Sequence, residues 1–275
     1  MSEAIQVGKV AVITGAALGI GRAAALHCVE RGMRVVMVDL ASEDFDAAVA
    51  AVGAAAGADG VLDAPVDVSD REAMAGLADE VRERFGPPSL LMNNAVTRVG
   101  GGVFASHDDW RTAFEVNFWG VLNGVEAFAP MMVEANGLAH IVNSGSKQGI
   151  TNPPGNAAYN VTKSAVKTYT EALQHELRGR EGCRVSAHLL VPGWTTTGKR
   201  EHKPGAWLPE QVVGRLMERL ARGSFYIVCP DNEVSEAEDR RRILWSAMDI
   251  TEDRPPLSRW HGGYDAEFAA FDPDG

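Results

Sequence analysis

Cysteine is scarce in this chain, and no hydrophobic run approaches the roughly 18 residues that a membrane-spanning helix requires. Cys28, Cys183 and Cys229 are far apart and form no C-x-x-C pair, so we expect reduced structural thiols. The N-terminal segment also lacks the apolar stretch of a secretory signal peptide. These absences argue against a disulfide framework, secretion and membrane insertion, and they favour a cytoplasmic protein.

Positive charge is also in deficit. Lysine and arginine total 26 against 37 aspartate and glutamate residues, which gives a formal net charge of −11. Nucleic acids and anionic membranes bind clustered basic residues, so we expect neither as a partner. The histidines show no metal-ligand spacing and no clustered carboxylates, so we expect no metal ion. The histidines without metal-ligand spacing include His107, His140, His175 and His188.

Apolar strand-like runs and helical segments alternate regularly along the chain. Its 275 residues, 45% of them hydrophobic, suffice for one large domain with a full core. The alternation predicts an α/β fold, a doubly wound parallel sheet of about seven strands with helices on both faces. We expect strands at 9–14, 34–39, 61–66, 89–93, 139–144, 184–191 and 225–230. We expect helices at 22–31, 42–56, 69–85, 108–136, 156–178 and 233–248.

A glycine-rich turn, with Gly15, Gly19 and Gly21, joins the first predicted strand to the first helix. Unpaired N–H groups and the positive end of the helix dipole suit a pyrophosphate there. Asp39 ends the second strand 18 residues after Gly21, near the interval at which an acidic side chain meets the adenosine ribose. A carboxylate at this position repels a 2′-phosphate, and neither neighbouring leucine, Leu18 or Leu40, supplies a cation. The turn therefore predicts NAD in preference to NADP.

Tyr159 and Lys163 lie four residues apart in a predicted helix, which places both side chains on one face. A tyrosine has a pKa of about 10, and a neighbouring ammonium lowers it toward the range needed for acid/base catalysis. The same spacing also occurs in ordinary solvated pairs. Its combination with the glycine turn and with Ser144 and Ser146 upstream indicates a catalytic pair.

These residues together resemble the short-chain dehydrogenase/reductase family, over roughly residues 9–197. The resemblance implies a Rossmann-type dinucleotide-binding and catalytic domain, which we place at 1–230, and NAD as the cofactor. The chain departs from the family pattern at Val96, where the family has glycine, and beyond about residue 224. The resemblance is carried by Thr14 to Gly21, Asp67-Val68, Asn93-Asn94-Ala95, Asn117, Ser146, Tyr159, Lys163 and Pro192-Gly193.

The resemblance also implies catalytic roles. Tyr159 is the expected general acid/base, and Lys163 is expected to bind the nicotinamide ribose and depress the tyrosine pKa. Asn117 is expected to hold a water in a proton relay to Lys163. The family's spacing of 13 residues before the tyrosine selects Ser146 over Ser144 as the residue that binds the substrate oxygen.

Cofactor contacts are expected from several loops. Asp67 and Val68 are expected to hold the adenine, Asn93 with Ala95 to line the channel, and Thr197 to orient the carboxamide. The full expected set is Gly15, Leu18, Gly19, Ile20, Gly21, Asp39, Leu40, Asp67, Val68, Asn94, Ala95, Tyr159, Lys163, Pro192, Gly193, Thr195 and Thr197.

No sequence motif identifies the residues that contact the substrate. We expect a lid region at 195–222, in which cationic side chains either meet an anionic substrate or form a solvated loop face. The extension at 231–275 is expected to pack on the same domain or on a neighbouring subunit. Its segment 254–261 is expected to close over the substrate, contact a neighbouring subunit or remain a solvated tail. The loop cations are Lys199, Arg200, His202 and Lys203. The expected substrate pocket is Ser146, Gln148, Tyr159, Trp194 and Trp207.

The activity that these residues predict is NAD-dependent interconversion of a secondary alcohol and a ketone by hydride transfer. An NAD(P)H-dependent carbonyl reductase would use the same residues in reverse. A non-catalytic dinucleotide-binding protein is a further alternative, because fold alone does not fix function. From the resemblance we expect a homotetramer or homodimer built on helices 108–136 and 156–178.

Overall fold

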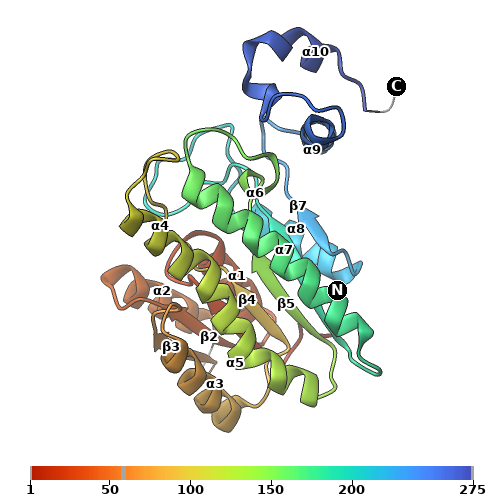
Figure 1. Ribbon diagram of the computed structural model, residues 1–275. Coiled ribbons are helices and arrows are strands. Elements are labelled where there is room, and N and C mark those ends of the chain that lie inside the picture. The colour runs from red at the N-terminus through yellow and green to blue at the C-terminus, as the bar shows by residue number, and fades with distance from the viewer. Residues whose placement is uncertain (1, 57–59, 274–275) are drawn as a thin grey trace.

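The computed structural model describes residues 2–56 and 60–273, and its centre is a seven-stranded sheet (Figure 1). The strand order is β3-β2-β1-β4-β5-β6-β7, and every neighbouring pair is parallel. This confirms the predicted fold class. The strands are β1 Val10–Thr14, β2 Arg34–Asp39, β3 Val61–Pro65, β4 Leu90–Asn93, β5 Ala139–Ser144, β6 Val185–Val191 and β7 Tyr226–Val228.

Helices cover both faces of the sheet because both faces of its strands are apolar. In β1, Ala11 and Ile13 face one hydrophobic cluster, whereas Val10 and Val12 face another. The first cluster is closed by α1 Gly19–Val29, α2 Glu43–Ala56 and α8 Pro209–Ala221. The second is closed by α3 Arg71–Phe85, α5 Gly120–Glu134 and α7 Ala157–Gly179, which lie side by side in Figure 1.

The helices differ from the sequence-based expectation in several places. Helix α1 begins at Gly19, not at residue 22, because the last two glycines of the turn form its first turn. The helix expected at 108–136 runs from 107 to 134, and in it α4 His107–Phe114 and α5 are joined by a π-helical turn, Glu115–Trp119. Helix α8 was not predicted, although its apolar side is buried against α1. Part of the expected lid region therefore belongs to the core.

Chain order reverses between β1 and β4, and the ligand crevice of such a sheet lies at this point, outside the carboxyl ends of the strands. The loops that follow β1, β4, β5 and β6 meet there. The fold thus brings the glycine turn, the two serines and the Pro192-Gly193 segment to one edge.

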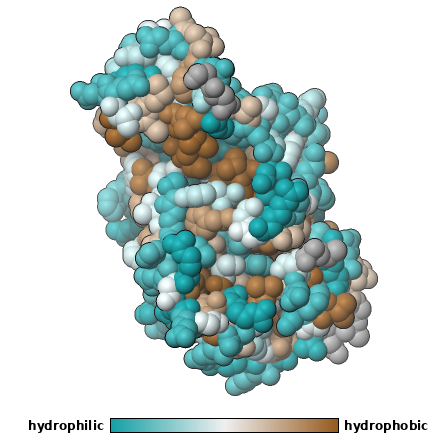
Figure 2. All heavy atoms as spheres, turned by 90° about the vertical axis from the view of Figure 1, so that its right-hand side faces the viewer, coloured by the Kyte–Doolittle hydropathy of each residue, from teal (hydrophilic) through white to brown (hydrophobic). Residues whose placement is uncertain are grey.

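The residues after β7 form a small C-terminal lobe, drawn in blue in Figure 1. It contains α9 Glu236–Thr251, the 3-10 turns Ser258–Trp260 and Gly262–Tyr264, and α10 Asp265–Ala270. Trp245 is the centre of this lobe. Its ring centroid lies 5.2 Å from that of Phe268 and 5.4 Å from that of Phe271, and the Arg254 guanidinium lies 4.0 Å from the Trp245 ring centroid. Figure 2 shows hydrophobic surface gathered where this lobe meets the body of the protein. Among the described residues, no helix is long and apolar enough to cross a membrane.

Candidate active site

The glycine turn is packed so closely that side chains are excluded from it. Gly15 and Gly19 have φ values of +67° and +55°, which favour glycine. A Cβ atom on Gly21 would lie 2.0 Å from the Gly15 carbonyl oxygen. Leu18, at the N-cap of α1, makes no side-chain cap hydrogen bond. The first turn of α1 therefore presents its N–H groups in the manner that a dinucleotide pyrophosphate requires.

Asp39 lies beside this turn at the end of β2. Its Oδ2 accepts a hydrogen bond from Ala17 N at 2.8 Å, and its Oδ1 accepts one from Leu40 N at 2.8 Å. A carboxylate has further lone pairs, so Asp39 retains capacity to accept from two ribose hydroxyls. The turn and the carboxylate together fit the adenosine half of a nicotinamide dinucleotide.

A single cleft of about 990 Å³ runs from this turn to Tyr159. The cofactor residues expected from the sequence line it, except Gly21, which packs behind Gly15, and Asn93, for which the expectation was wrong. Asn93 does not line it, because its buried side chain donates to Asn143 Oδ1. Trp207 also lies outside the cleft lining, packed against the first hydrophobic cluster. The other expected substrate residues, Ser146, Gln148, Tyr159 and Trp194, all line the cleft.

Tyr159 and Lys163 lie on the face of α7 that closes the cleft. Lys163 is 2% exposed, and its Nζ donates to the Ser144 carbonyl oxygen at 2.7 Å. The same Nζ lies 5.8 Å from the centre of the Tyr159 ring. The Arg98 guanidinium, from the loop after β4, lies 5.3 Å from that ring centre. Two basic side chains therefore face one phenol.

Burial and, secondarily, the charge of Arg98 lower the pKa of Lys163 to about 7. The unfolded chain, with an ordinary lysine pKa, binds more protons than the folded chain between about pH 7 and pH 10. We therefore expect the unfolding free energy of wild type, relative to Lys163→Met, to rise by a few kcal/mol across that range. Urea unfolding at several pH values measures this difference.

Lys167→Met is the matched control for that experiment. Lys167 lies on the same helix but is one-third exposed and pairs with Glu171 at 2.8 Å. The unfolding free energy of Lys167→Met, plotted against pH, is expected to stay nearly parallel to that of wild type. A parallel curve for Lys163→Met as well would contradict the assignment of a desolvated ammonium at this site.

Ser144, which ends β5, and Ser146, in the loop that follows, make different contacts. The Ser144 hydroxyl donates to Asn94 Oδ1 at 3.2 Å, which ties β5 to the loop after β4. The Ser146 oxygen accepts from Gln148 N at 3.2 Å. Within residues 2–56 and 60–273, no acceptor engages the Ser146 proton. Ser146 is therefore free to donate a hydrogen bond into the cleft.

Asn117 is fully buried behind the cleft, in the π-helical turn. Its Oδ1 accepts from Thr97 N at 2.8 Å, while its Nδ2 donates to Thr97 O at 3.1 Å and to Thr162 Oγ1 at 3.3 Å. These contacts hold the loop that carries Arg98 against α7. The expected water relay from Asn117 to Lys163 stays a prediction.

Three charged residues at this edge escaped the sequence analysis: Arg98, Lys147 and Asp231. Arg98 and Lys147 are close in sequence to expected site residues, but neither belongs to a motif with a defined spacing. Of the cations in the expected lid, Lys199 pairs with Asp44 at 3.0 Å across the mouth of the cleft. Within the described parts of the chain, no cluster of histidine, cysteine and acidic residues could hold a metal ion.

Comparisons with a family profile, with known sequences and with solved structures point to the same protein family. The sequence profile of the short chain dehydrogenases matches residues 9–205. SadH of Mycobacterium tuberculosis is 42% identical over 171 residues, and the match spans only 61% of SadH and 62% of this chain. Meso-2,3-butanediol dehydrogenase of Serratia marcescens is 33% identical over 216 residues, covering 80% of that protein and 78% of this chain. A short-chain dehydrogenase/reductase of Burkholderia phymatum, solved with NAD, superposes with a TM-score of 0.83 at 33% identity, covering 98% of that chain and 93% of this one.

Proposed function

Because the chain belongs to the short-chain dehydrogenase/reductase family of oxidoreductases, we propose that it interconverts a secondary alcohol and a ketone with NAD. The observation that carries the proposal is the cleft in which Tyr159, faced by Lys163 and Arg98, lies together with Ser146 and the glycine turn. The similarity to a dehydrogenase of a secondary diol supports the substrate class.

The proposed mechanism assigns one task to each side chain. Tyr159, as phenolate, accepts the hydroxyl proton of the alcohol, and the Arg98 guanidinium lies 5.3 Å from its ring centre. Ser146 donates a hydrogen bond to the reacting oxygen and stabilises the charge that develops there. When bound, the nicotinamide ring supplies the hydride acceptor. Lys163, whose pKa burial lowers to about 7, is largely a neutral amine near pH 9 and can therefore accept the proton that is relayed from Tyr159.

Initial rates with a panel of secondary alcohols and ketones test this proposal. We expect turnover of alcohols with NAD, followed by nicotinamide absorbance near pH 9, and slower turnover with NADP. Faster reduction of ketones with NADPH would instead identify a carbonyl reductase. Saturable NAD binding without turnover of any member of the panel would favour a non-catalytic binding protein.

Cofactor preference is proposed to depend on Asp39. Asp39→Ser is expected to reduce the ratio of kcat/KM for NAD to that for NADP by roughly 10–100-fold, since hydrogen bonds to a charged group are worth about 1.5–3 kcal/mol. Asp44→Ser is the control, because Asp44 lines the same end of the cleft but pairs with Lys199. An unchanged ratio in Asp39→Ser would remove Asp39 from the cofactor site.

We also propose a homotetramer or homodimer built on α4, α5 and α7. Trp119 and Val161 are 47% and 43% exposed on these helical segments, and large apolar side chains of this kind favour burial in an interface. Trp119→Glu is expected to shift the protein to smaller species in sedimentation equilibrium. Wild-type protein that sediments only as a monomer would contradict the proposal.

A further inference from the structure

Lys147, which directly follows Ser146, forms a nearly buried ion-pair cluster with two carboxylates of the C-terminal region. Its Nζ lies 2.7 Å from Asp239 Oδ2 and 3.4 Å from Asp231 Oδ2. The side chains of Lys147, Asp231 and Asp239 are only 18%, 4% and 7% exposed. The loop that carries Ser146 is therefore anchored to helix α9 and to the segment before it.

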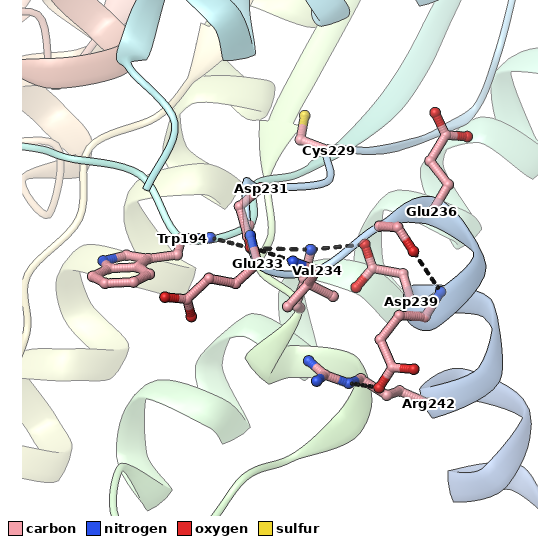
Figure 3. A network of polar contacts seen from close by, with 12 residues as sticks. Trp194, Cys229, Asp231, Glu233, Val234, Glu236, Asp239 and Arg242 are labelled. Carbon is pink, nitrogen blue, oxygen red and sulfur yellow. Dashed lines mark hydrogen bonds and ion pairs between the residues drawn. The ribbon is translucent and has the colours of Figure 1, made fainter. Parts of the chain in front are cut away.

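Asp231 also holds the loop that follows β6 (Figure 3). Its Oδ2 accepts from Trp194 N at 3.0 Å, while its Oδ1 accepts from Val234 N at 2.8 Å. Gly193 packs directly on the cluster, since a Cβ there would lie 2.7 Å from Asp231 Oδ2 and 2.9 Å from Lys147 Nζ. One carboxylate thus fixes two of the loops that line the cleft.

The neighbouring Asn232 extends this anchoring to residues 204 and 205, within the expected lid. Its backbone N donates to Gly205 O at 3.1 Å, and its Nδ2 donates to Pro204 O at 2.7 Å. Trp207 N closes the loop by donating to Trp194 O at 2.8 Å. The loop 194–207 is therefore attached to Asp231 at its start and to Asn232 near its end.

The surroundings make the cluster strongly dependent on charge pairing. A small cavity beside it has an apolar lining from Ile150 and Val191, and Asp239 itself lines the cavity. Burial raises the pKa of Asp239, whereas Lys147 lowers it. In such surroundings, removing the Lys147 charge leaves two carboxylates without their cation. Removing the Asp239 charge leaves Lys147 with only its longer contact to Asp231, so in both cases the loops that these groups hold must move.

We propose that Asp231 and Asp239 are positioning residues that act through Lys147 and the Trp194 amide to place Ser146 and the 192–197 loop for reaction. Both carboxylates lie outside the residues 9–205 that match the family profile. The C-terminal lobe is therefore part of the machinery that orients the substrate. This inference rests on the proposed role of Ser146.

Charge-removing variants test the proposal. Asp239→Asn and Lys147→Met are each expected to lower kcat/KM for the alcohol by about 10–100-fold, since a displacement of about 1 Å at the reacting groups costs on that order. The loss falls mainly on kcat, and NAD affinity changes far less because most expected cofactor contacts lie on other loops. The matched control is Glu236→Gln, which removes a different ion pair of α9, with Arg215 of α8. Near-wild-type kcat in both test variants would overturn the proposal.

The triple variant Lys147→Met/Asp231→Asn/Asp239→Asn separates positioning from stability. Replacing all three charges leaves no unpaired charge in the cluster, so its melting temperature is expected to recover from that of Lys147→Met toward that of wild type. Its kcat is expected to stay low, because nothing then fixes the serine loop. Recovery of both melting temperature and kcat would show a purely structural role and would also overturn the proposal.

Hydrogen exchange gives a readout that does not depend on turnover. In Asp239→Asn, amides in 145–151 and 192–197 are expected to exchange faster, while those of α1 are unchanged. Glu236→Gln is expected to leave both loops protected. If wild type turns over no alcohol, the proposed function fails, and this exchange pattern alone decides whether α9 positions the loops. Equal exchange in Asp239→Asn and wild type would contradict the positioning role.

Discussion

Replacing Tyr159 with phenylalanine is expected to lower kcat by roughly 10²–10⁴-fold, the usual contribution of a positioned acid/base group. The ring still fills its place between Arg98 and Lys163, so the affinity for NAD is expected to change little. Absorbance of the reduced nicotinamide gives kcat, and a nucleotide titration followed by fluorescence gives the affinity.

Tyr169→Phe is the matched control, because Tyr169 lies on the same helix but packs in the core near Phe118. Burial raises the pKa of Tyr169 to about 12, so it stays protonated at the assay pH. Loss of the Tyr169 hydroxyl is expected to leave kcat near the wild-type value. Wild-type turnover in Tyr159→Phe would remove Tyr159 from the chemistry.

Gly21→Ala is expected to weaken dinucleotide binding by at least about tenfold and to lower the melting temperature by roughly 2–10 °C. The added Cβ would lie 2.0 Å from Gly15 O and 2.9 Å from Asn94 Nδ2, so the turn and the start of α1 must separate. Overpacking of this kind costs about 1–3 kcal/mol. Thermal unfolding with and without NAD measures both effects.

Gly53→Ala provides the control for this substitution. A Cβ on Gly53, within α2, meets no atom closer than 4 Å, and alanine favours a helix over glycine by about 1 kcal/mol. The control is expected to be slightly more stable than wild type, with unchanged NAD binding. Equal behaviour of the two alanine variants would show that the turn does not require glycine at position 21.

The sheet was predictable because its strands are buried on both sides and read as short apolar runs, such as Val10 to Thr14. The glycine turn, Asp39, Tyr159 and Lys163 were recognisable because each has a fixed spacing from an element that sequence alone identifies. In each case the information is local, carried by residues within one strand, turn or helix.

Other parts of the site depend on contacts between distant segments and left no such pattern. Helix α8 was hidden inside a polar stretch, although its buried apolar residues recur at helical spacing. Arg98 meets Tyr159 only because the loop after β4 folds against α7. The partners of Lys147 lie 84 and 92 residues later, and a salt bridge carries no sequence periodicity.

Transfer of deuterium tests the central claim most directly. Wild-type protein would be incubated with NAD and a pool of secondary alcohols deuterated at the carbinol carbon, and the nicotinamide product would be analysed by mass spectrometry. The proposed mechanism predicts reduced cofactor that carries the deuterium, formed roughly 10²–10⁴-fold more slowly by Tyr159→Phe. Saturating NAD binding with no deuterium transferred from any alcohol would contradict it.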